Sequence, residues 1–144
     1  DGLKFNGDTA AANALDDYEE GSWTPVIHQG LTSPTYTSTN GFYTKIGRIV
    51  FFSLRFHATG TNNNDGVIIT GLPFSSHSGS GTESGAVFNY SGNISGNSLP
   101  TPKMHIGGNT SQIDFYSNDG NRWTGDEGNG ISGRTLHIHG QYIV

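Results

Sequence analysis

The chain has 144 residues, of which only 13% are charged, and its formal net charge is −5. This balance excludes the basic stripe that a nucleic-acid-binding protein needs, and the lack of cysteine excludes disulfides and thiolate chemistry. No apolar run approaches the ~18 residues of a membrane-spanning helix. Gly, Ser, Thr and Asn make up nearly half of the sequence, and they favour turns and solvent-facing strand positions. The composition therefore predicts one turn-rich, all-β domain.

The first predicted element is a short helix over Ala10–Glu20, which is rich in Ala, Leu and Glu and is followed by Gly21 as a stop. The acidic stretch LDDYEEGSWTP, Leu15–Pro25, begins inside this helix. Its four carboxylates allow two interpretations. The stretch is either an acid cluster with a chemical role or a joint between two kinds of structure.

The clearest strand is RIVFFSLRFHA, Arg48–Ala58. Residues at alternate positions share one face of a strand. The predicted core face consists of Val50, Phe52, Leu54 and Phe56. The other face is apolar at Ile49 and Phe51 and polar further on, so we expect a second sheet's rim, the N-terminal segment or a neighbouring subunit to cover it.

Further short strands follow from apolar and aromatic runs separated by turn signals such as NNNDG, Asn62–Gly66. We expect these strands at Trp23–His28, Phe42–Ile46, Val67–Thr70, Ala86–Tyr90, Lys103–Ile106, Gln112–Tyr116 and Arg134–Val144. This number of strands, without βα alternation, predicts an antiparallel β-sandwich that is jelly-roll-like.

Catalytic signatures are weak. The glycine pattern GNGISG, Gly128–Gly133, is followed by a strand and not by the helix that a dinucleotide site requires. The carboxylates, which a glycosidase would need as a converging pair, are either local and solvated or spread over loops. They are Asp16, Asp17, Glu19, Glu20, Asp114, Asp119, Asp126 and Glu127. We therefore predict a protein that is not an enzyme and requires no cofactor.

One histidine pair is placed for metal binding. His137 and His139 lie two residues apart in a predicted strand, so both point to the face opposite Leu136, Ile138 and Tyr142. Two imidazoles are too few for a metal site in one chain. Three copies of the pair around a threefold axis would complete an octahedral set for a structural ion. The alternative is a pair of ordinary surface or interface histidines.

The segment Tyr116–Gly130, YSNDGNRWTGDEGNG, is the part of the sequence most typical of recognition. Aromatic faces with a rim of polar groups suit a sugar. The candidate ligand-binding residues are Tyr116, Asp119, Asn121, Arg122, Trp123, Asp126 and Glu127. Two alternatives stay open: the tryptophan packs on the core beneath a polar loop, or the carboxylates hold Ca²⁺.

Three segments in order, Leu15–Pro25, Gly41–Val50 (GFYTKIGRIV) and Ile69–Phe74 (ITGLPF), resemble the C-terminal domain of bacteriophage tail fibres and related receptor-binding proteins. The closing HIHGQYIV, His137–Val144, is also similar to the end of that domain. The motifs cover roughly the first half of the chain, and their order makes them more specific than any one alone.

The resemblance implies a homotrimeric β-sandwich head at the distal end of a fibre on the virion. Residues 1–21 would be the end of the fibre shaft and the neck, joined to the rest of the fibre, and residues 22–144 the receptor-binding head. Lys45 and Arg48 could then pair with the neck acids. The paired arrangement of His137 and His139 resembles elongated phage fibre tips, in which His-x-His pairs bind iron at the threefold axis.

We therefore expect a non-enzymatic adhesin that binds a glycan or an outer-membrane receptor on a bacterial host. Ile49 and Phe51 are expected at the interface with two identical subunits. Two other functions stay open. One is a trimerisation cap or virion decoration module, and the other is a carbohydrate-binding module attached to a depolymerase.

Overall fold

The computed structural model describes residues 17–78, 86–92, 103–117, 120–125 and 131–144. These residues contain strands and no helix, so none of them forms a helix able to cross a membrane. The strands are β1 (Tyr18–Trp23), β2 (Val26–Gln29), β3 (Leu31–Ile46), β4 (Ile49–Asn62), β5 (Ile68–Thr70), β6 (Ala86–Gly92), β7 (Lys103–His105), β8 (Gln112–Tyr116) and β9 (Arg134–Ile143).

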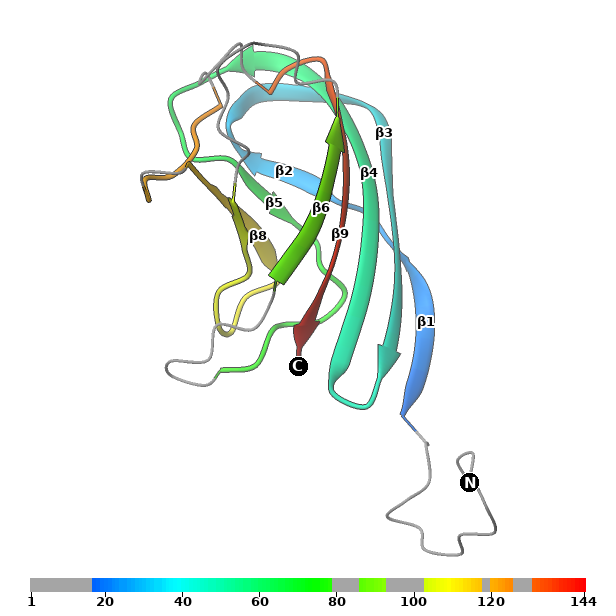
Figure 1. Cartoon of the computed structure of the whole chain (residues 1–144). Helices are drawn as coiled ribbons and strands as arrows, with labels where there is room; N and C mark the ends of the chain where they lie inside the picture. The colour runs from blue at the N-terminus through cyan, green and yellow to red at the C-terminus, as the bar shows by residue number, and fades with distance from the viewer. Residues whose placement is uncertain (1–16, 79–85, 93–102, 118–119, 126–130) are drawn as a thin grey trace, which may run out of the picture.

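The strands form two antiparallel layers (Figure 1). Hydrogen bonds join them in the order β1-β3-β4-β9-β6-β7-β8-β5-β2. The first five strands of that order make one layer and the last four make the other. One residue pair, Ala86 with His105, links the layers between β6 and β7. The order β9-β6-β7-β8 is a Greek key, which is common in β-sandwiches. The predicted antiparallel β-sandwich is confirmed.

The core lies between the layers, and β4 contributes the face that its alternation predicts. Val50, Phe52, Leu54 and Phe56 are each at most 4% exposed. Burying each such side chain contributes about 1.5–3 kcal/mol. Strand β9 adds Leu136, Ile138 and Tyr142, as predicted, and the opposite layer adds Ile69, Ile113 and Phe115.

Residues of the recognised motifs make two defined sets of contacts in the core. Trp23 packs edge-on to Phe52, with ring centroids 6.3 Å apart, and it lies over Gly41, where a Cβ would be 2.4 Å from the indole. The Tyr142 hydroxyl donates to the carbonyl oxygen of Phe74 at 3.1 Å and accepts the Phe74 N–H at 3.2 Å. Burial raises the pKa of Tyr142 to about 12. The closing strand therefore fixes the ITGLPF segment.

The helix predicted over Ala10–Glu20 is wrong at its C-terminal end. Tyr18–Glu20 belong to β1, which pairs along its whole length with β3, from Tyr18 opposite Ile46 to Trp23 opposite Gly41. Pairing with a long strand satisfies the backbone groups that a one- or two-turn helix leaves exposed. Residues 10–16 lie outside the described residues. The sheet therefore runs across the predicted boundary between residues 21 and 22.

Strand β3 is much longer than the predicted Phe42–Ile46. It begins at Leu31 and includes the polar run TYTSTN. Its register with β4 shifts twice, between Thr32 and Thr35 and between Tyr36 and Ser38. Residues that resemble a loop by composition are strand here because β4 supplies their hydrogen-bond partners. The predicted turn after Asn62 is confirmed, with β4 ending there and β5 beginning at Ile68.

Candidate functional site

The side of β1, β3, β4 and β9 that points away from the core carries most of the exposed large apolar side chains of the described residues. We call it the outer face. Strand register places its side chains in rows across the sheet. The first row is Tyr18, Ile46, Ile49 and Ile143; the second is Glu20, Thr44, Phe51 and Gln141; the third is Ser22, Phe42, Ser53 and His139; the fourth is Asn40, Arg55 and His137.

The first two rows carry an exposed apolar cluster, which we call the apolar end. It consists of Tyr18, Ile46, Ile49, Phe51 and Ile143. Each of these side chains is between 40% and 54% exposed. A contiguous apolar patch of this kind on a soluble protein marks an interaction surface. Ile49 and Phe51, the predicted interface residues, both belong to it.

The next two rows surround a shallow depression of about 320 Å³, which we call the polar hollow. Its exposed lining comes from three adjacent strands and is given by Asn40, Phe42, Ser53, Arg55, His137 and His139. Phe42 is 62% exposed, which is unusual for a phenylalanine on a sheet. Ser53 is small and lies between Phe42 and His139 in its row, so it leaves space between the two rings.

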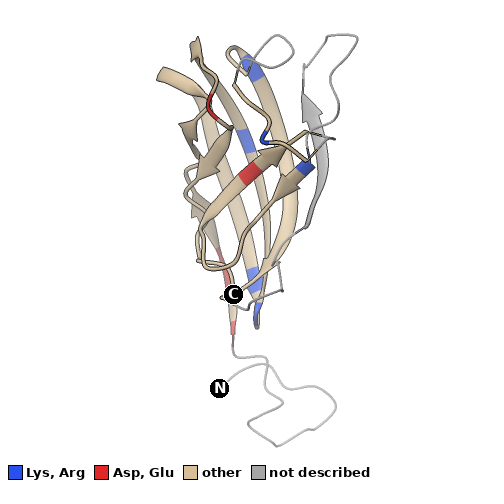
Figure 2. Cartoon of the chain, turned by 90° about the vertical axis from the view of Figure 1, so that its left-hand side faces the viewer, with Lys and Arg blue, Asp and Glu red and all other residues tan. Residues whose placement is uncertain are grey.

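The hollow has an unneutralised cation. Figure 2 shows how sparse charged residues are over the sandwich. Arg55 is exposed, and within the described residues no ion pair joins it to a carboxylate. The carboxylate on the described outer face is Glu20, on β1, which accepts the Tyr18 hydroxyl at 2.7 Å. In an acidic chain, the hollow therefore presents hydrogen-bond donors and positive charge.

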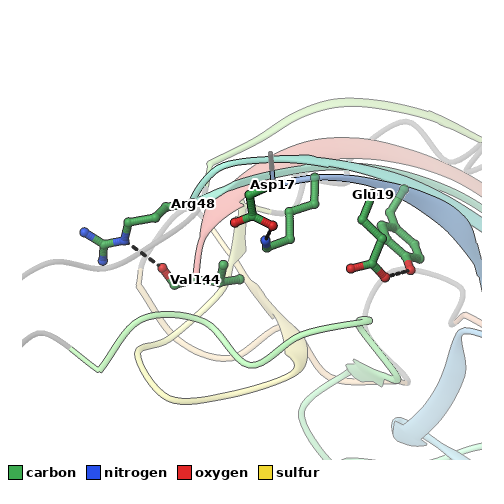
Figure 3. Close-up of polar contacts among 6 residues, drawn as sticks. Asp17, Glu19, Arg48 and Val144 are labelled. Atoms are coloured by element: carbon green, nitrogen blue, oxygen red, sulfur yellow. Dashed lines mark hydrogen bonds and ion pairs between the residues drawn. The ribbon is translucent and has the colours of Figure 1, made fainter. Parts of the chain in front are cut away.

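The acidic stretch lies at the end of the sandwich where β1 begins, and Figure 3 shows its contacts. Asp17 forms an ion pair with Lys45, as predicted, and Glu19 accepts a hydrogen bond from the Tyr43 hydroxyl at 2.6 Å. That hydrogen bond raises the pKa of Tyr43 because it stabilises the neutral phenol. Arg48 donates from Nε to the carbonyl oxygen of Val144 at 3.0 Å. Asp17 and Glu19 thus bond to residues of β3, the neighbour of β1. These contacts favour the interpretation of the acidic stretch as a joint over its interpretation as an acid cluster with a chemical role.

The predicted recognition loop differs from expectation at its centre. Trp123 is 2% exposed and packs against Phe115 with centroids 6.1 Å apart, so the prediction of an exposed tryptophan platform is wrong. Backbone hydrogen bonds fix it: its N–H donates to the Phe115 carbonyl and its carbonyl accepts from Val67. Burial of the large indole outweighs the polar character of the neighbouring residues.

Of the other predicted ligand-binding residues, those that the structure describes lie together at one turn. Arg122 forms an ion pair with buried Asp114 at 3.0 Å and lies over the half-buried Tyr116 ring at 5.8 Å. Asn121 is exposed at the turn beside this pair. Asp119, Asp126 and Glu127 lie outside the described residues. Arg122 thus has a structural role in holding the loop on β8.

His137 and His139 are both exposed on the outer face, opposite the buried Leu136 and Ile138, as predicted. Within the described residues, no group of three or more His, Asp or Glu side chains is placed to hold a metal ion. Both imidazoles line the polar hollow.

Sequence reasoning missed Phe42, Asn40 and Arg55 as site residues. The alternation in NGFYTKI indicates that Phe42 and Tyr43 point to opposite faces of a strand. The register with β4 determines that Phe42 is the outward one. Comparison of the chain with protein-family models, with curated proteins and with solved structures finds no match.

Proposed function

We propose that this chain is the non-enzymatic head of a homotrimeric bacteriophage tail fibre, placed at the distal end of the fibre and binding a glycan on the host surface. The rest of the fibre would join it through the N-terminus. Support comes from the three ordered motifs, from the β-sandwich that contains them, and from the outer face. The apolar end of that face carries the proposal.

Exposed large apolar side chains favour burial against another surface. The apolar end is continuous across four strands, so a sister copy could cover it as a unit. It lies at the end of the sandwich where β1 begins and the C-terminus lies (Figure 1). Packing there would place three copies side by side near the proposed neck, with the rest of each outer face free.

A fibre head functions through many weak contacts with the host surface and does not need catalytic turnover. Three sites of modest affinity bind a repetitive surface tightly because the second and third contacts are intramolecular. Among the described carboxylates, Asp114 is tied to Arg122, while Asp17 and Glu19 bond to Lys45 and Tyr43. These three carboxylates therefore serve contacts that hold the fold.

A trimerisation or decoration module is the second candidate function. The burial of Trp123 favours it, because the loop expected to contact the host contributes its largest side chain to the core. A carbohydrate-binding module of a depolymerase would use the same polar surfaces without needing the apolar end. Assembly and binding must therefore be measured separately.

The test uses the full chain, fluorescently labelled, against a microbial glycan array and a panel of bacterial cells, with its mass measured in the same buffer. The adhesin proposal predicts a trimer that binds a subset of surfaces. A trimer that binds none would support the module instead. A monomer that binds soluble glycans would support the carbohydrate-binding module and overturn the fibre-head proposal.

A further inference from the structure

We propose that the polar hollow binds an acidic saccharide, with a sugar ring on Phe42 and its anionic group at Arg55. This inference rests on the adhesin function and names the ligand class and the residues that hold it. It places this contact on the outer face, apart from the buried Trp123.

The position of the hollow follows from register. Arg55 of β4 lies opposite Asn40 of β3 and opposite His137 of β9. Directly opposed residues on one sheet face have Cβ atoms about 4.5–5.5 Å apart. Asn40 and His137 therefore lie on either side of Arg55 in its row. The three groups supply N–H donors that could converge on one anionic group.

The aromatic component is one row away. Phe42 is opposite Ser53, and Ser53 is opposite His139. The small serine makes a floor between Phe42 and His139, whose strands are two strand spacings apart, or roughly 9.6 Å. A volume of about 320 Å³ is at the lower end of the range for small-molecule sites. A saccharide's apolar ring face would contact Phe42, as sugars do on aromatic side chains.

The positive charge of Arg55 favours binding of an anionic sugar over a neutral one. Arg55 lacks an ion-pair partner within the described residues, whereas Lys45 and Arg122 each have one. A guanidinium binds a carboxylate or phosphate through two parallel N–H···O bonds. A uronic acid and a sugar phosphate share this chemistry, and both occur with a ring beside the charge. A neutral sugar would leave the Arg55 guanidinium without an anionic partner.

The experiment titrates the full chain with trigalacturonate, with neutral galactotriose of the same length, and with glycerol phosphate, by protein NMR. The proposal predicts millimolar binding of trigalacturonate or glycerol phosphate, and about tenfold weaker binding of galactotriose, because only the anions pair with Arg55. The preferred anion identifies the source of the charge. Equal binding of acidic and neutral probes would overturn the proposal.

Two variants locate the site. Arg55→Gln should weaken anion binding about tenfold or more and leave the weak neutral binding unchanged. Phe42→Ala should weaken all ring-bearing probes and leave glycerol phosphate unaffected. The control Lys103→Gln removes the same charge from an exposed position in the other layer and should change nothing. An Arg55→Gln chain that binds like the control would place the site elsewhere.

The failure of this inference can be told from the failure of the proposed function. If Arg55→Gln changes the mass of the assembly and not anion binding, the hollow holds a sister copy's carboxylate and the saccharide proposal is wrong. If cell binding persists in Arg55→Gln at the original level, the adhesin proposal stands and this site is wrong. Loss of cell binding with an unchanged mass supports both.

Discussion

Replacing Phe51 with threonine tests whether the apolar end is buried between copies. Phe51 leaves 43% of its surface exposed in the single chain. A phenylalanine presents roughly 200 Å², so complete cover by a neighbour would remove about 85 Å² from water. At about 25 cal/mol per Å² this contributes about 2 kcal/mol per copy as an upper value. Threonine keeps the β propensity of the position and loses most of that area.

Three copies lose the contribution together, about 6 kcal/mol, which corresponds to roughly 10⁴-fold in the association constant. Sedimentation equilibrium over a range of concentrations would show the Phe51→Thr chain dissociating where the unmodified chain stays assembled. Val26→Thr is the matched control, since Val26 is 41% exposed on a strand of the other layer. Equal dissociation of both variants, or none in Phe51→Thr, would refute the reasoning.

The other predictions concern the single chain and use urea denaturation. Gly41→Ala should destabilise it by about 1–3 kcal/mol, because the new Cβ would lie 2.4 Å from the Trp23 indole; unchanged stability would contradict that packing. Tyr142→Phe should cost about 1–3 kcal/mol through its two hydrogen bonds to Phe74. The folded pKa of Tyr142 is raised from 10.0 to about 12, so its stabilisation is present below pH 10 and is lost as pH rises toward 12. Tyr142→Phe should therefore flatten the alkaline loss of stability, and an unaltered pH profile would contradict its burial. Asp17→Asn should cost less than about 1 kcal/mol, because its carboxylate is 55% exposed; a larger loss would mean that the joint is more rigid than its exposure implies.

The core could be predicted from the sequence wherever one strand carries a strict alternation. Val50 to Phe56 and Leu136 to Tyr142 fall on the faces that their spacing predicts, because one side of each strand is buried against the other layer. The helix at Tyr18–Glu20 could not be excluded, because local propensity favours it. Pairing with β3, which is 16 residues long, overrides that preference.

The site was harder to predict because it depends on register between strands distant in sequence. The outward direction of Phe42 and its position two strands from His139 follow from the β3–β4 and β4–β9 pairings, and neither is visible in NGFYTKI alone. Trp123 shows the opposite error. Polar neighbours made its loop resemble a binding surface, whereas backbone bonds to Phe115 and Val67 carry the indole into the core.

The mass of the unmodified chain in solution tests the central claim most directly. If copies cover each other's apolar ends, sedimentation equilibrium will give three times the 15.3 kDa of one chain, independent of concentration across the micromolar range. A mass of 15.3 kDa at every concentration would mean that Ile49, Phe51 and their neighbours face water in the functional molecule, and would contradict the fibre-head proposal.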